Sequence, residues 1–216
     1  MARTIFFAII VITLAAIAAV FFYHAKPAVK EAVTVPDEKP VIGWRKDFTV
    51  SSGAGAIPEG WKLQGKPWTK QAVFSVRTDA RDRSSFLRME ADRASASIIT
   101  VTDGLDIRKT PMLRWRWRVT VLPEGADGRF ENKDDQAIGI YVGTGSALDN
   151  KSVSYRWDTE TPKGAQGDAA YGLGGIKVKW HTLRNKEDAV GGEWFTEERD
   201  IAEDFNKAWG FCPDKL

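Results

Sequence analysis

Three arginines recur at every second position, at Arg114, Arg116 and Arg118, inside the run LRWRWRV at residues 113–119. Side chains of a β-strand point alternately to opposite faces, so this spacing predicts a strand that carries all three guanidinium groups on one face. A guanidinium group binds a carboxylate through two parallel hydrogen bonds. The arginine face therefore has the chemistry to bind an anionic sugar or another carboxylate in a groove.

A plainer interpretation of the arginine face stays open. Like charges at neighbouring positions repel each other unless acidic side chains lie across from them on adjacent strands. Glu90, Asp92 and Asp158 fall on the polar faces of their own predicted strands, where they could form a charge ladder with the arginines. The charge ladder is the favoured interpretation, and the groove is the alternative.

Two adjacent carboxylates, Asp134 and Asp135, stand between a charged loop and a predicted strand. One interpretation is a turn cap or an ion pair with Arg116 or Arg118. A second is a calcium site, because calcium prefers clustered oxygen ligands. A third is a catalytic pair for glycoside hydrolysis, which needs a second acid some ångströms away. The candidates for that second acid are Glu90, Asp158 and Glu198.

The tryptophans divide into two groups. The first group alternates with aliphatic residues on dry strand faces and is expected in the core: Trp115, Trp117, Trp157 and Trp180. The second group lies in loop-like sequence: Trp61, Trp68 and Trp194. As a group they are the better candidates for stacking on the apolar face of a sugar ring, whereas for any single one of them burial as a loop anchor is favoured.

Several other chemistries are disfavoured. His181 and Cys212 are the single histidine and cysteine of residues 42–216, so no zinc site is expected, and His181 is expected to be exposed on its strand. Residues 31–216 carry 28 basic and 29 acidic residues. Because nucleic acid binding needs a clustered excess of positive charge, no nucleic acid partner is expected. No cofactor is expected either, with calcium as the open alternative.

Residues 4–23 form an uncharged, apolar stretch that is long enough to cross a bilayer as a helix. Because Arg3 precedes it, residues 1–25 are interpreted as a signal anchor or a signal peptide. The apolar run to Tyr23 favours the anchor. Residues 26–41 are interpreted as a linker and residues 42–216 as a domain. We expect this domain to face the periplasm on an inner-membrane anchor, or to be secreted there if the segment is cleaved.

Short alternating segments recur along the domain, and about eight of them predict strands. Residues 159–175 lack periodicity and are expected to be a surface excursion. Residues 196–209 have helical spacing, with Thr196 as N-cap and Gly210 as terminator. The pattern predicts an all-β fold, an antiparallel sandwich or jelly roll with one C-terminal helix, preceded by the N-terminal hydrophobic helix. Residues 113–119 are expected to be a central strand.

Several sequence blocks occur together in a known family: PMLRWRWRV at 111–119, KDD at 133–135, IYV at 140–142, VSYRWD at 153–158 and ERDI at 198–201. On these blocks, residues 43–212 resemble the bacterial domain of unknown function 3047 family. The resemblance implies an envelope protein with a jelly-roll sandwich akin to carbohydrate-binding modules, and it supplies no catalytic residues. Similar proteins continue into at least one more strand, whereas this chain stops at Leu216. Either the last strand is absent or the chain is a shortened version.

These features predict an exported or membrane-anchored binding module of the cell envelope whose ligand is a glycan. The expected contacts come from the arginine face and from Trp61, Trp68 and Trp194. The alternative from another class is a glycan-processing hydrolase that uses Asp134 or Asp135 with a second acid. A third hypothesis is a structural partner in envelope assembly, whose exposed sheet edge pairs with another chain. Binding without catalysis is favoured.

Overall fold

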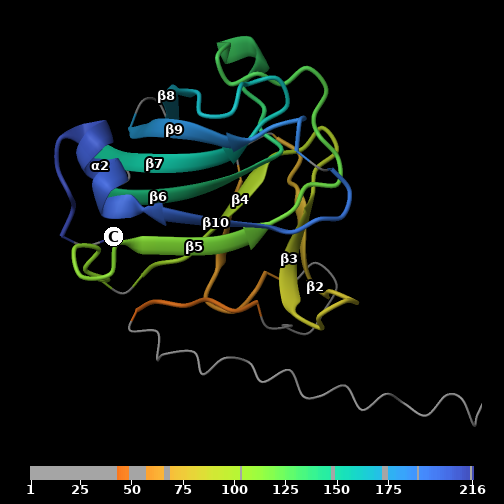
Figure 1. Cartoon of the computed structure of the whole chain (residues 1–216), viewed down its shortest axis with the longest axis horizontal. Coiled ribbons are helices and arrows are strands. Elements are labelled where there is room, and N and C mark those ends of the chain that lie inside the picture. Colours follow the sequence, from red (N-terminus) through yellow and green to blue (C-terminus); the bar gives the residue numbers. More distant parts are fainter. Residues whose placement is uncertain are drawn as a thin grey trace, which may run out of the picture. The chain divides into compact units, whose positions relative to one another are not determined.

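The computed structural model describes residues 43–48, 57–65, 69–102, 104–146, 149–171, 175–188, 190–214 and 216. Within these residues the chain forms ten β-strands, one 3-10 helix and one α-helix (Figure 1). In chain order they are β1 (Lys62–Gly65), β2 (Val73–Thr78), β3 (Ser85–Glu90), β4 (Ala96–Ile99), β5 (Met112–Trp117), η1 (Glu131–Lys133), β6 (Ile138–Ser146), β7 (Asp149–Trp157), β8 (Gln166–Tyr171), β9 (Ile176–Arg184), β10 (Phe195–Asp200) and α2 (Ile201–Trp209).

The largest sheet has four strands in the order β6-β7-β9-β8. β7 runs antiparallel to β6 and parallel to β9, and β8 runs antiparallel to β9. The other described strands pair two by two, as β5 with β10, β2 with β3 and β1 with β4. The described residues therefore form antiparallel and mixed sheets with a single C-terminal helix, which confirms the predicted all-β fold class.

β5 forms because its apolar and basic residues alternate. Trp117 and Val119 are buried and Trp115 is half-buried, whereas Arg114 and Arg116 are exposed, which confirms the predicted separation of faces. The expected central position of this strand is wrong for the described residues, because among them β5 pairs with β10 alone.

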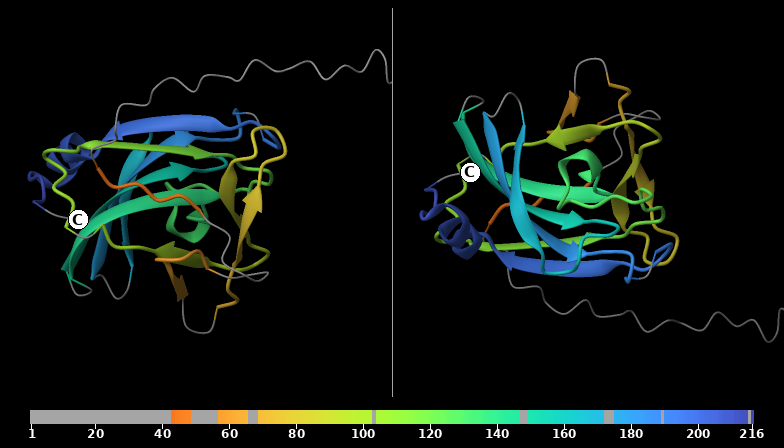
Figure 2. Two further views of the ribbon diagram at one scale, coloured as in Figure 1. Left: turned by 90° about the horizontal axis from the view of Figure 1, so that it is seen from below. Right: turned by 90° about the horizontal axis from the view of Figure 1, so that it is seen from above.

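The aromatic face of β5 packs on β7 to make the core. The Trp115 ring stacks on the Tyr155 ring at 5.2 Å between centroids, and the Trp117 ring meets the Trp157 ring edge-on at 5.8 Å. Figure 2 shows the β5–β10 layer lying along one face of the four-stranded sheet. Each large side chain buried this way contributes about 2–3 kcal/mol. α2 adds Phe205, which is 0 % exposed, to the same core.

The segment after residue 194 differs from the expected single helix at 196–209. Phe195–Asp200 is the strand β10, because the backbone of β5 needs a hydrogen-bonding partner. The cap of α2 is Asp200, whose side chain accepts a hydrogen bond from the backbone N–H of Glu203, so Thr196 is not the N-cap. Gly210 ends the helix as expected, with a φ of 74° that favours glycine.

Residues 159–175 also differ from expectation, because this stretch contains the strand β8, which pairs with β9. β8 lacks hydrophobic alternation because two of its three inward positions are the small residues Gly167 and Ala169. A Cβ at Gly167 would collide with the ring of Trp180 on the neighbouring strand. The packing of one large indole thus explains why the strand is hard to recognise.

The predicted anchor and linker, residues 1–41, lie outside the described residues. Among the helices that the structure does describe, none combines the length and apolar character that a membrane crossing requires.

Candidate functional site

The second face of β7 carries polar side chains that are nevertheless buried. Ser154 and Arg156 are 0 % exposed, and Asp158, which follows the strand, is 1 % exposed. The sequence placed Asp158 on a polar face available to the arginines of β5, but it lies in the interior. The loop at Gly128 covers this end of the face. In Figure 2, η1, which follows that loop, lies on the side of the sheet opposite to the β5–β10 layer.

Arg156 is held by partners from three other parts of the chain. Its Nη1 donates a hydrogen bond to Asp134 Oδ1 at 2.6 Å, and its Nη2 donates to the hydroxyl of Tyr171 at 3.0 Å. Its guanidinium carbon lies 5.0 Å from the centroid of the Trp180 ring. Burial by itself would lower the pKa of Arg156, but nearby groups, among them Tyr141 and Asp134, raise this pKa overall. The guanidinium group therefore keeps its charge inside the protein.

Tyr141 on β6 is the exposed residue next to the buried polar side chains of β7. Its side chain is 41 % exposed. Gly139 and Tyr141 are the cross-strand partners of Arg156 and Ser154, so all four share one face of the sheet. A Cβ built on Gly139 would lie 2.9 Å from Cε2 of Tyr141, which means that the ring lies across this glycine. Gln136 Nε2 donates to the Tyr141 hydroxyl at 2.7 Å and fixes the ring.

Unpartnered polar atoms concentrate in this region. Seven buried side-chain nitrogen or oxygen atoms lack a hydrogen-bond partner among the described residues, and four of them lie here: Gln136 Oε1, Ser154 Oγ, Arg156 Nε and Asp158 Oδ1. Each such atom costs about 1–3 kcal/mol when it stays unpaired. Their clustering indicates a place where a polar ligand or ordered water binds. The Arg156 cluster, as we name it, comprises Asp134, Gln136, Tyr141, Ser154, Arg156, Asp158, Tyr171 and Trp180.

A tight loop covers the inner part of the Arg156 cluster. A Cβ built on Gly128 would lie 3.0 Å from both Arg156 Nη1 and Asp158 Oδ2. The backbone N–H of Gly128 donates to Thr161 Oγ1 at 2.8 Å, which fixes the loop. Burial raises the pKa of Asp158, whose carboxylate sits beneath this loop. Asp158 is therefore a buried group without access to a polymer substrate.

The arginine face of β5 meets acids and aromatic rings. Arg118 Nη1 lies 3.2 Å from Asp79 Oδ2, and its guanidinium carbon lies 4.6 Å from the Trp194 ring centroid. Arg116 Nη1 lies 3.4 Å from Asp82 Oδ2 in a largely exposed pair. Arg114 is exposed and stands opposite Glu198 on β10. The acids come from the turn between β2 and β3, so two of the arginines help to hold that hairpin against β5.

Two of the three loop tryptophans, Trp61 and Trp194, lie in the described part of the chain and have different partners. Trp194 donates its indole N–H to Asp79 Oδ2 at 2.7 Å, as a structural anchor does. Trp61 is half-buried, with its ring 5.8 Å from that of Phe48. Trp68 lies outside the described residues.

The adjacent carboxylates Asp134 and Asp135 do not share one environment. Asp134 pairs with Arg156 rather than with Arg116 or Arg118, whereas Asp135 is exposed. Within the residues that the structure describes, no group of three or more histidine, cysteine, aspartate or glutamate side chains is arranged to hold a metal ion.

The residues expected in the core divide as follows. Trp117, Trp157 and Trp180 are each at most 3 % exposed, and Trp115 is half-buried.

His181 is half-buried rather than exposed, with its ring 6.1 Å from that of Tyr155, and burial lowers its pKa. The reason is that α2 packs on the same face of the sheet.

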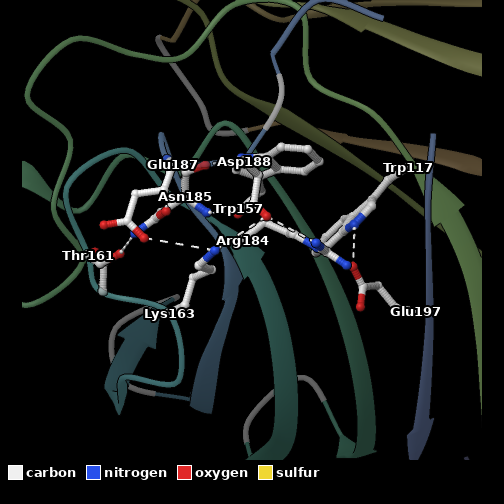
Figure 3. A network of polar contacts seen from close by, with 9 residues as sticks. All are labelled: Trp117, Trp157, Thr161, Lys163, Arg184, Asn185, Glu187, Asp188 and Glu197. Atoms are coloured by element: carbon white, nitrogen blue, oxygen red, sulfur yellow. Dashed lines mark hydrogen bonds and ion pairs between the residues drawn. The ribbon is translucent and has the colours of Figure 1, made fainter. Parts of the chain in front are cut away.

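A polar network joins β10 to the end of β9 (Figure 3). Glu197 accepts hydrogen bonds from Trp117 Nε1 at 3.1 Å and from Arg184 Nε at 2.7 Å. The backbone carbonyl of Asn185 accepts one from Trp157 Nε1 at 3.2 Å. The network therefore provides hydrogen-bond acceptors for the N–H groups of two core indoles, which is a structural role. The Arg156 cluster remains the candidate site.

Of the comparisons with known proteins, the one with protein-family models finds a match. No curated protein and no solved structure matches the chain. The family model described as Protein of unknown function (DUF3047) matches residues 59–216, which include every strand described above, α2 and the Arg156 cluster. The chain therefore belongs to the DUF3047 family of proteins of unknown function.

Proposed function

We propose that this protein is a glycan-binding module of the cell envelope, exported and tethered to the inner membrane through residues 4–23. The Arg156 cluster is its binding site. One observation carries the proposal: an exposed aromatic ring, Tyr141, lies beside a buried layer in which four polar atoms lack partners among the described residues.

The chemistry of a sugar fits these features. A pyranose ring has an apolar C–H face, which can stack on the exposed ring of Tyr141, and a rim of hydroxyl groups. The rim hydroxyls can donate to the carboxylate of Asp134, which is 19 % exposed, and to Gln136 Oε1. Because these side chains are held by the sheet and by mutual hydrogen bonds, little ordering is required when a ligand binds.

Hydrolysis is supported less well than binding. A glycosidase needs two carboxyl groups that both reach the scissile bond. In the Arg156 cluster, Asp134 forms a 2.6 Å ion pair with Arg156, and Asp158 is 1 % exposed. The proposal therefore assigns Asp134 to holding Arg156 and the bound sugar, and Asp158 to a structural role beside Arg156, rather than either acid to proton transfer.

The test uses the full-length protein in detergent on a glycan array and in pull-down with insoluble polysaccharides. We expect binding to at least one glycan, and an affinity loss of about tenfold in Tyr141→Ala, which corresponds to about 1.4 kcal/mol. Tyr141→Phe keeps the ring and should lose less. Arg114→Ala, on the other sheet, is the matched surface control and should bind normally.

Two outcomes would overturn the proposal. One is a folded protein that binds no glycan on the array. The other is glycan binding that Tyr141→Ala leaves intact and Arg114→Ala or Arg116→Ala removes, since this result would place the site on β5.

A further inference from the structure

A second concave surface lies on the other face of the four-stranded sheet. It is a groove of about 370 Å³ between the β8–β9 pair and the end of α2. Its side chains include Asp168 and Ala170 from β8, Lys177 and Lys179 from β9, and Trp209 from α2. None of these residues belongs to the Arg156 cluster.

The register of β8 and β9 explains the shape of the groove. Ala170 stands opposite Lys177, and Asp168 stands opposite Lys179, so these four side chains share one face. The methyl group of Ala170 is the smallest of the four and leaves a depression between longer neighbours. Trp209 closes one side, and its indole N–H donates to the backbone carbonyl of Ser152 at 3.3 Å, which fixes the ring.

The groove combines positive charge with an aromatic wall. The ammonium group of Lys179 lies 5.4 Å from the centroid of the Trp209 ring and 2.8 Å from the carboxylate of Asp168. The ammonium group of Lys177 lies 3.7 Å from Asp149, and the Lys177 side chain is 53 % exposed. Both ammonium groups thus border the same small depression, and each has an exposed acid as its present partner.

We infer that this groove is a separate binding site for an acidic sugar, a hexuronate ring in a glycan chain. Its volume suits a ring-sized ligand, since pockets for small molecules begin at about 300 Å³. The carboxylate of the sugar meets Lys177 and Lys179, and an apolar edge of its ring meets Trp209. A concave surface of this size does not fit a flat membrane. The inference goes beyond the proposed function, because the groove uses other residues on the opposite face of the sheet.

Asp168 gives the inference a specific consequence. Its side chain is 70 % exposed and now pairs with Lys179, so an incoming carboxylate has to compete with it. Exposed ion pairs add little to stability, so Asp168→Asn should fold normally. Asp168→Asn should therefore bind a hexuronate more tightly than the unaltered protein does. A purely structural Lys179–Asp168 pair would give no such gain.

The test is calorimetric titration of the full-length protein in detergent with trigalacturonate, and with neutral galactotriose as the uncharged comparison. We expect trigalacturonate to bind more tightly than galactotriose at low salt. Lys177→Gln combined with Lys179→Gln should weaken this binding by at least about tenfold, since charge-assisted hydrogen bonds are lost. Lys62→Gln, an exposed lysine on β1, is the matched control and should change nothing.

Tyr141→Ala separates this inference from the proposed function, because the groove should bind trigalacturonate unchanged in that variant. The inference is wrong if trigalacturonate does not bind at low salt, or if the double lysine variant and Asp168→Asn both bind it with unaltered affinity. It is also wrong if the same lysines bind only vesicles of equal parts phosphatidylglycerol and phosphatidylcholine, which would identify a lipid surface.

Discussion

Asp134 and Arg156, 22 residues apart in the chain, form a 2.6 Å ion pair in which the arginine side chain is 0 % exposed. The pair links the segment before β6 to the interior of the four-stranded sheet. A charge in such a place is tolerated because its partner is close and because Tyr171 accepts a second hydrogen bond.

Removing one partner of this pair should destabilise the protein more than removing both. Asp134→Ala leaves the Arg156 charge buried without its carboxylate, and we expect a loss of about 3 kcal/mol in the free energy of unfolding. Arg156→Met added to Asp134→Ala should recover part of that loss. Urea denaturation of the two single variants and the double variant measures the coupling, and strictly additive losses would contradict this account.

The hairpin of β2 and β3 should depend on Trp194 and not on Arg114. Trp194 donates to Asp79 and packs on Arg118, so Trp194→Ala is expected to lower the free energy of unfolding by about 2 kcal/mol. Arg114→Ala, at an exposed position, should change it by less than about 0.5 kcal/mol. Thermal unfolding followed by tryptophan fluorescence distinguishes the two, and an equal effect of both variants would refute the assignment.

Protonation of His181 should destabilise the fold. Burial holds the pKa of His181 below its usual 6.5, with a smaller opposing effect from Asp204 and smaller contributions in the same direction from Arg199 and Lys207. The unfolded chain therefore binds a proton more readily below pH 6.5, and stability is lost as the pH falls through that range. Urea midpoints at pH 5.5 and 7.5 should differ less in His181→Gln. His24→Gln, outside the described residues, is the control and should leave the difference unchanged.

The apolar residues 4–23 should keep the protein in the membrane. We expect the full chain to stay in the membrane fraction after carbonate extraction. The reason is that about 20 consecutive apolar residues can cross the hydrocarbon core of a bilayer as one helix. A variant without residues 4–23 should be soluble. Protease added to spheroplasts should degrade the domain. An N-terminus that starts after Ala18, by mass spectrometry, would show cleavage in place of anchoring.

The central pattern of the fold could be predicted because β5 alternates two strongly different kinds of side chain. Indoles at 115 and 117 and arginines at 114 and 116 leave no other arrangement than opposite faces of a strand. β10 could not be recognised in the same way. Its inward positions include Glu197 and Arg199, whose charges are satisfied by Trp117 and by Asp204, so the strand lacks a dry face in the sequence.

The candidate site was harder to predict than the fold. A period of two assigns Ser154 and Arg156 to one face of β7, but it cannot tell whether another layer covers that face. The layer consists of residues distant in sequence, such as Gly128, which contacts Arg156 closely. A weaker signal did exist in β6, where Gly139 precedes Tyr141 by two positions, since such spacing leaves room for a ring to lie along its own strand.

Trp117 and Glu197, joined by a hydrogen bond, are 80 residues apart in the chain. The backbone of β5 pairs with β10, so this pairing and the covering of the β5 indoles require a contact between distant parts of the chain. Closing a loop of this length is slow compared with forming a local hairpin. The β5–β10 layer is therefore a long-range part of the fold, and we expect it to form after the local hairpin of β2 and β3, which joins strands only a few residues apart.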